Sequence, residues 1–398
     1  MSTKLISRNP DLQRLRNEGY EVEVRNGYLI IHSVPYVTSQ RLIAFGKIVT
    51  NLDLHGELTR RPDSHQVWFA GEFPCKHDGT PISAIRHTSA DRILFDGMVV
   101  NHHFSNKPKA GYADYYEKVT RYIEIISSHA KVIDETVDAR TFKPIESADE
   151  DSVFRYTDSA SARANIVMVS KKLTMNRIAI VGLGGTGAYT LDLVAKTPTR
   201  EIHLFDGKMF LQHNAFRAPG AASIDVLNAK PSKVAYWAEL YGQMHRGIVP
   251  HEVLLDPANI SELAGFDFVF VCVDKPAVRR LIADYLIGQG IPFIDVGMQV
   301  ELVEEEQVLI GACRATLVTS DRSDHFERHV CTEREPDDDV YLSNIQVADL
   351  NALNAAMAVI KWKKFCTFYQ DCYEEHQSVY VINTHQLTRD EIKESPPE

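Results

Sequence analysis

The pattern of apolar and polar positions divides the chain into two parts. In residues 1–145 the period is mostly two, as in strands with one buried face. Glu21 to Ile31 alternates and is interrupted at Asn26-Gly27, a strong hairpin signal. Gln66 to Ala70 and Asp91 to Phe95 are further predicted strands. This first part is therefore predicted to be a separate, smaller α+β domain.

A long helix is also predicted in the first part. Between Tyr112 and Ile126 apolar residues recur every three or four positions, so they share one helix face. The residues of that face are Tyr115, Val119, Tyr122, Ile123 and Ile126. Residues 146–165 are polar and acidic, which predicts a linker between a first domain (1–145) and a second domain (166–398).

The second part begins with the pattern of a buried parallel strand, Arg177 to Val181, and a helix pattern follows from about Leu191. The turn between them contains Gly182, Gly184, Gly185 and Gly187. Bare backbone in such a turn can approach phosphates, and the N-H groups of the helix N-terminus attract anions. The next predicted strand ends on Asp206, about 20 residues further on, where an acid accepts ribose hydroxyls. These features suit NAD and ATP equally.

Composition narrows the class of protein. The chain has 398 residues, 44% hydrophobic and 24% charged, which is ordinary for a globular protein of two domains. A net charge of -11 argues against nucleic acid as the main partner. No signal-peptide pattern and no apolar run of membrane-spanning length occurs, so we expect a cytoplasmic protein without a membrane partner. The six cysteines form no C-x-x-C pair, which predicts reduced thiols and no structural zinc.

Two features of the first domain are candidates for metal binding or thiol reactivity. His102 and His103 are adjacent, and adjacent strand residues point to opposite faces, so they make a poor pair of metal ligands and no metal site is predicted there. Cys75 precedes Lys76 and His77, which could lower its pKa. We favour the interpretation of Cys75 as an exposed loop cysteine.

Three later segments favour ATP over NAD. An ATP site must gather cations around the triphosphate and hold Mg²⁺ on it. Arg217 and a lysine that opens a helix, Lys233 or Lys230, would neutralise phosphate charge, and Asn214 would bond phosphate without adding charge. Asp274 follows an apolar strand and offers the hard carboxylate that Mg²⁺ prefers. NAD binding requires no such set.

These residues resemble, in order, the motifs of the adenylating enzymes typified by ThiF, MoeB and the ubiquitin-activating enzymes. That family has a G-x-G-G-x-G turn, an acid, S-N-L-N-R, a lysine and T-D-N-x-x-x-R. The corresponding residues here are Gly182 to Gly187, Asp206, His213 to Arg217, Lys233 (or Lys230), and Val273 to Arg279. The resemblance covers roughly the last 230 residues and implies a Rossmann-like adenylation domain with a mainly parallel sheet that binds ATP and Mg²⁺.

Which lysine meets the phosphates depends on where the helix begins. Pro231 favours a helix start that places both Lys230 and Lys233 in the first turn, and the pattern from Val234 onward favours Lys233. The chain departs from the family at Lys208, Ala218 and Lys275, and its C-x-x-C zinc pairs are missing.

A covalent step would need a thiolate in a mobile, partly exposed segment. The charged stretch from Asp321 to Asp339 is predicted to be a loop, and it contains Cys331 two residues after His329, which makes Cys331 the candidate acceptor. A bystander thiol is the alternative, and Ser323 or Thr332 would be acceptor hydroxyls. Cys272 and Cys313 are predicted to be packing residues, Cys313 in a strand.

A long alanine-rich helix is predicted from Asn344 to Trp362. It resembles the late helix that packs across a homodimer interface in the family, although its small-residue face also suits packing within one chain.

The leading hypothesis is ATP-dependent adenylation of the C-terminal carboxylate of a small ubiquitin-like protein in a bacterial conjugation pathway, with transfer to a Cys or hydroxyl as a second step. The first domain would recognise the ubiquitin-like protein or a conjugating enzyme. One alternative is activation of a sulfur-carrier protein or a small-molecule carboxylate. A second is a catalytically silent scaffold with the same fold.

Overall fold

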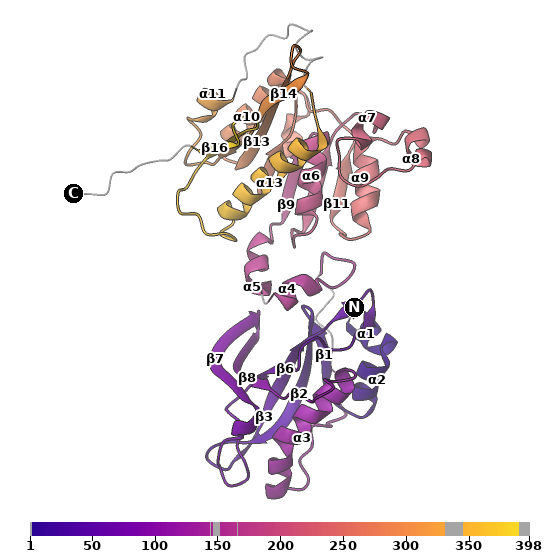
Figure 1. Cartoon of the computed structure of the whole chain (residues 1–398), viewed down its shortest axis with the longest axis vertical. Helices are drawn as coiled ribbons and strands as arrows, with labels where there is room; N and C mark the ends of the chain where they lie inside the picture. Colours follow the sequence, from indigo (N-terminus) through magenta and orange to yellow (C-terminus); the bar gives the residue numbers. More distant parts are fainter. Residues whose placement is uncertain (1, 144, 146–151, 165, 331–344, 390–398) are drawn as a thin grey trace, which may run out of the picture. The chain divides into compact units, whose positions relative to one another are not determined.

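A computed structural model describes residues 2–143, 145, 152–164, 166–330 and 345–389. The chain forms two compact units, Met1–Lys171 and Lys172–Glu398. Figure 1 shows both units, each with its own sheet.

The first unit is built on a six-stranded antiparallel sheet in the order β1-β2-β3-β6-β8-β7. Its strands are β1 (Val22–Arg25), β2 (Tyr28–Val37), β3 (Ile43–Asn51), β6 (Gln66–Ala70), β7 (Arg86–Phe95) and β8 (Met98–Ser105), with a small separate pair, β4 (Leu54–His55) and β5 (Leu58–Thr59). Asn26 and Gly27 both have positive φ, as a two-residue hairpin between β1 and β2 requires. The predicted hairpin is confirmed.

Helices cover both faces of this sheet. α1 (Ser2–Arg8), α2 (Pro10–Asn17) and α3 (Tyr115–Ile133) share one core with inward residues of β2, β3 and β6. The predicted face of α3, from Tyr115 to Ile126, is buried in that core, and the Asp114 side chain caps the helix by accepting from the Glu117 N-H. On the other face, Ala162 of α4 (Ser159–Arg163) is buried against Tyr28, and α5 (Val167–Ser170) follows. Residues 152–164 and 166–171 thus belong to the first unit.

The second unit is a three-layer α/β domain around an eight-stranded sheet in the order β11-β10-β9-β12-β13-β14-β15-β16. The first five strands in that order are parallel: β9 (Arg177–Val181), β10 (Glu201–Phe205), β11 (Ile248–His251), β12 (Phe268–Val271) and β13 (Phe293–Val303). β14 (Val308–Val318), β15 (Gln377–Val381) and β16 (Gln386–Arg389) continue it in antiparallel fashion. The predicted Rossmann-like fold with a mainly parallel sheet, preceded by an α+β domain, is confirmed.

Helices pack on both faces of this sheet as well. On one face, α6 (Gly185–Val194), α9 (Lys233–Gly242) and α13 (Ala348–Phe365) bury a core around Trp237 and Trp362. On the other, α10 (Pro276–Gln289) and α11 (Phe326–His329) bury a second core. The two short helices α7 (Gln212–Ala215) and α8 (Ile224–Ala229) lie between β10 and α9 in the chain. Helices on both faces leave the carboxyl ends of the parallel strands open to a ligand.

The predicted boundaries of the late helix were wrong. α13 begins at Ala348, because Val347 is extended, and it runs to Phe365 rather than Trp362. Its small-residue face, with Ala355 and Ala358 fully buried, packs within the chain, and Figure 1 shows α13 lying along α6. Asn344 lies outside the described residues.

Candidate nucleotide site

The glycine turn joins β9 to α6 through very close backbone contacts. Gly182 has φ +91° and donates its N-H to Phe205 O at 2.8 Å, and an added Cβ would lie 2.7 Å from Cys272 O. A Cβ on Gly187 would lie 1.8 Å from Gly182 O. Gly182 and Gly187 therefore have no room for a side chain. Gly182 also lines a cavity, together with Gly184 and Gly185. Because Gly184 caps α6, the N-terminal N-H groups of the helix lie beside that cavity.

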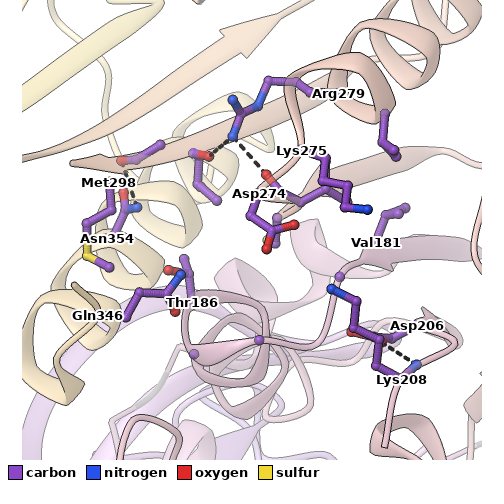
Figure 2. Close-up of a pocket in the computed structure, with 18 of the residues that line it drawn as sticks. Val181, Thr186, Asp206, Lys208, Asp274, Lys275, Arg279, Met298, Gln346 and Asn354 are labelled. Atoms are coloured by element: carbon purple, nitrogen blue, oxygen red, sulfur yellow. Dashed lines mark hydrogen bonds between the residues drawn. The ribbon is translucent and has the colours of Figure 1, made fainter. Parts of the chain in front are cut away.

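Asp206 connects three parts of the site. Its carboxylate accepts from Leu183 N and Lys208 N, both at 2.8 Å, and lies 3.3 Å from the Lys233 Nζ. Figure 2 shows Asp206 beside Lys208, with their hydrogen bond drawn. Asp206 is buried, yet it lines the cavity. The carboxylate therefore holds the glycine turn and a lysine together at the end of β10.

The two candidate lysines occupy different places. Ser232 caps α9 by accepting from Ala235 N, so Lys233 is the first residue of that helix, and it is buried and lines the cavity. Lys230 is exposed, ends α8 in a left-handed conformation with φ +47°, and is not among the cavity residues. The prediction that both lysines share the first turn was wrong, because the helix starts after the Ser232 cap.

Arg217 and Asn214 come from the segment after β10, and both line the cavity. Asn214 Oδ1 accepts from Leu211 N at 2.9 Å, so one side of this amide stabilises its own loop. Arg217 is half-buried, and its Nε is a buried donor without a hydrogen-bond partner among the described residues. Burial lowers the pKa of Arg217 and Asp274 opposes that shift. A buried guanidinium donor at a cavity wall is suited to an anion.

Asp274 and Lys275 lie between β12 and α10, exposed to the same cavity. Figure 2 shows both on this loop, with Asp206 and Lys208 on another loop of the cavity. A carboxylate near groups that would bind phosphates fits Mg²⁺, which proteins usually hold by one or two carboxylates plus substrate phosphates. Within the described residues, no group of three or more His, Cys, Asp or Glu side chains could hold a metal ion.

The cavity extends well beyond these residues, with a volume of about 1360 Å³. Its far side is formed by β13, β14 and α13, through residues such as Met298, Arg314 and Asn354, which no sequence motif indicated. Asp295, behind this wall, was missed too. The available signal was a charged residue inside an apolar run, as in Phe293-Ile-Asp295-Val296.

Burial raises the pKa of several of the cysteine thiols that the structure describes. Cys331, the candidate acceptor, and Thr332 lie outside the described residues. Cys313 is fully buried in β14, where burial raises its pKa to about 11, and burial raises that of Cys272, beside the cavity, to about 12. Cys75 is also buried, and burial raises its pKa, so the expectation of an exposed loop cysteine was wrong. Its N-H is bonded to Val37 O, which draws it inward.

The stretch before Cys331 is more ordered than predicted. The expected loop from Asp321 contains α11, whose first residue Phe326 is buried, as is Val330 directly after the helix. The loop prediction was therefore wrong for residues 326–329, because these two apolar residues anchor the charged stretch to the second core. His329 lines the cavity, and Ser323 is partly exposed.

His102 and His103 of the first unit point to opposite faces of the sheet, as predicted. His103 stacks on Trp68 with 5.2 Å between ring centroids, and His102 contacts Phe73 edge to face at 5.2 Å on the other side of β8. Both rings thus take part in aromatic packing.

Fold and site together define a Rossmann-like α/β protein with a glycine-turn cavity at the carboxyl ends of its strands. The chain belongs to the ThiF family, whose sequence profile matches residues 118–397. A second profile, a domain of unknown function named DUF6791, matches residues 10–159. The resemblance inferred from the motifs is thereby confirmed. None of the described helices is both long and apolar enough to cross a membrane.

Curated relatives match over a limited stretch. The chain is 32% identical over 125 residues to the adenylyltransferase and sulfurtransferase UBA4 of Yarrowia lipolytica, covering 31% of each chain. It is also 32% identical over 125 residues to the Aspergillus terreus protein of that name, covering 31% of this chain and 25% of the relative. The alignments therefore span less than a third of these relatives.

Solved structures of Escherichia coli MccB are similar at low identity. The structure of MccB with MccA-N7isoASN aligns with a TM-score of 0.47 at 17% identity, covering 58% of this chain and 69% of that one. The structure of MccB with ATP aligns with a TM-score of 0.46 at 17% identity, covering 58% and 68%.

Proposed function

We propose that the protein is an ATP-dependent adenylyltransferase that activates the C-terminal carboxylate of a small ubiquitin-like protein. The observation that carries the proposal is the convergence of Arg217, Lys233, Asp206 and Asp274 on one cavity beside the glycine turn. Membership of the ThiF family and the adenylyltransferase names of the curated relatives support it.

In the proposed reaction one bond to phosphorus forms and one breaks. A carboxylate oxygen of the substrate attacks the α-phosphorus of ATP, the bond from that phosphorus to the bridging oxygen breaks, and pyrophosphate leaves with the electron pair. Arg217 and Lys233 would stabilise the negative charge that spreads over the phosphates. Asp274 would hold Mg²⁺, which when bound supplies further positive charge to the phosphates.

The size of the cavity supports a second reactant. At about 1360 Å³ it exceeds the roughly 300–1,000 Å³ that is typical of sites for one small molecule. ATP at the glycine turn would leave the side formed by Met298, Arg314 and Asn354 for the acyl substrate. A polypeptide tail fits this arrangement better than a small acid does, because the tail would enter from outside and occupy the extra length.

We also propose a partner, a pathway and an oligomeric state for the protein. The first unit would recognise the ubiquitin-like protein or a conjugating enzyme in a bacterial conjugation pathway, and the active form would be a cytoplasmic homodimer. Transfer of the acyl group to the thiol of Cys331 would be a second step. A covalent adduct that persists in Cys331→Ala would remove this residue as the acceptor.

A second candidate is activation of a sulfur-carrier protein. The names of the curated relatives favour it, because they combine adenylyltransferase with sulfurtransferase. The products separate the two candidates by mass spectrometry. A thiocarboxylate at the C-terminus of the carrier indicates sulfur transfer, whereas an amide or ester to another protein indicates conjugation.

Exchange of labelled pyrophosphate into ATP tests the reaction itself. The wild-type chain should catalyse exchange only with its carrier protein, tested as the glycine-tailed small proteins encoded near its gene. Asp274→Ala and Arg217→Ala should abolish exchange, while Lys230→Ala should retain it. No ATP binding and no exchange with any carrier would refute the adenylyltransferase and leave a catalytically silent scaffold.

A further inference from the structure

A buried carboxylate joins two arginines in the wall of the cavity. Asp295 of β13 is fully buried, and its Oδ1 lies 2.8 Å from Arg279 Nε. Its Oδ2 accepts from Arg314 Nη2 at 2.5 Å. Both arginines line the cavity, and one carboxylate cannot neutralise both. Because a buried charge is costly unless paired, the three side chains depend on one another for their positions.

Arg279 links this cluster to Asp274. Its Nη2 donates to the backbone oxygen of Val273 at 2.8 Å, and Val273 immediately precedes Asp274. The same Nη2 lies 3.5 Å from Val296 O on β13. Figure 2 shows both bonds leaving the Arg279 guanidinium, next to Asp274. The peptide that leads into Asp274 is thus bonded by a side chain that forms an ion pair with Asp295.

Arg314 reaches Asp295 across a gap left by a glycine. Gly297 on β13 is paired with Arg314 on β14, and an added Cβ at Gly297 would lie 2.7 Å from Arg314 Nη2. Arg314 Nη1 also donates to Thr316 Oγ1 at 2.6 Å. The guanidinium is therefore held by two separate bonds in one plane, which a lysine ammonium could not reproduce from the same place.

We propose that Asp295 and Arg314 are positioning residues that orient Asp274 through Arg279. This inference rests on the proposed function, in which Asp274 holds Mg²⁺ on ATP. Without Arg314, Oδ2 of Asp295 loses its partner in a buried place, so the carboxylate turns and Arg279 loses its fixed anchor. The Val273 peptide then becomes more mobile, so Asp274 is less well positioned to bind the Mg²⁺-ATP complex. Residues that orient a metal ligand in this way typically change metal affinity or activity by about 10–100-fold.

Binding of ATP at graded Mg²⁺ concentrations tests the inference without the carrier protein. Isothermal titration of the full chain would compare wild type, Arg314→Met, Arg314→Lys, Asp295→Asn and Gly297→Ala. In Arg314→Met the Mg²⁺ concentration for half-maximal enhancement of ATP binding should rise about tenfold or more, while affinity for ATP without Mg²⁺ changes less than about twofold. Arg314→Lys should lie between that variant and wild type.

Two further variants separate positioning from simple stabilisation. Gly297→Ala adds only a methyl group in the path of Arg314, and it should shift the Mg²⁺ dependence in the same direction even if Asp295→Asn fails to fold. Arg280→Met removes a partly exposed arginine of α10 that pairs with Asp284 and Glu327, and it should leave the Mg²⁺ dependence unchanged.

Failure of the proposed function and failure of the positioning inference give different experimental results. If wild type binds no ATP, the proposed function falls and this inference with it. If Arg314→Met and Gly297→Ala bind ATP with the Mg²⁺ dependence of wild type, whatever their melting temperatures, the inference alone is overturned and the cluster only joins β13 and β14.

Discussion

Lys233 Nζ lies 3.3 Å from Asp206 Oδ2, and both side chains are more than nine-tenths buried. The sequence pattern predicted separate ligands for them, phosphate and ribose, but in the folded chain they form an ion pair with each other. Asp206 also accepts two backbone N-H groups. The lysine that would meet phosphate is therefore held by the acid that would meet ribose, and the two roles are coupled.

Removing one partner of this pair should be costly. Asp206→Asn leaves the Lys233 ammonium buried without a counter-charge, and we expect the free energy of unfolding in urea to fall by about 3–5 kcal/mol. The double variant with Lys233→Met should lose less than Asp206→Asn alone, because no buried charge remains. A double variant less stable than Asp206→Asn would contradict the coupling.

The two candidate lysines should differ in ATP affinity. Lys233→Met should weaken ATP binding by about tenfold or more, since a hydrogen bond to a charged group contributes about 1.5–3 kcal/mol. Lys230→Met, at an exposed position outside the cavity, should change it by less than about twofold. Titration calorimetry of both variants measures the contrast, and equal losses would disprove the assignment.

Two glycines of one turn should respond differently to alanine. A Cβ on Gly187 would overlap the backbone at Gly182, so Gly187→Ala should lower the free energy of unfolding by about 1–3 kcal/mol. A Cβ on Gly184 meets nothing within 4 Å but faces the cavity, so Gly184→Ala should cost less than about 1 kcal/mol of stability. It should nevertheless weaken ATP binding about tenfold. Unfolding curves and titration calorimetry on both variants measure the two effects. A larger loss of stability in Gly184→Ala than in Gly187→Ala would contradict the different roles of these glycines.

The first unit should lose stability in mild acid. Burial, aided by His87 and Arg92, lowers the pKa of His103 from 6.5 to about 4. The unfolded chain then binds the proton more readily than the folded chain, so the contribution of His103 to stability is complete above pH 6.5 and is lost as pH falls toward 4. His103→Gln should show a flatter decline of unfolding free energy between pH 7.5 and 4.5, whereas substitution of the exposed His55 should not. An equally steep decline in His103→Gln would assign the effect to other groups.

Local patterns predicted much of each unit correctly. The turn of the β1–β2 hairpin is formed by Asn26 and Gly27, and the buried face of α3 follows from the spacing of its own residues. The glycine turn was visible for the same reason. Such features involve residues within one or two turns of each other, so a single stretch of sequence contains the whole signal.

Errors arose where a neighbouring element decided the outcome. Cys75 looks exposed between polar residues, but pairing with Val37 buries it. Lys230 looks like a helix residue, but the Ser232 cap excludes it from α9. The charged stretch after Asp321 looks like a loop, but Phe326 and Val330 pack into a core formed by α10 and the sheet.

The sequence by itself determined the class of fold and the family, because the glycine turn and the residues after it each stand at a recognisable place after a strand or at a helix start. It also predicted which residues would meet a nucleotide: the glycine turn, Asp206, Arg217, Lys233 and Asp274. Only the tertiary structure decided which side chains hold one another. The Lys233–Asp206 pair joins positions 27 residues apart, the Arg314–Asp295 pair joins positions 19 apart, and the Thr186–Asn351 bond joins positions 165 apart. Strand order and helix packing bring such residues together, and no local period encodes those distances.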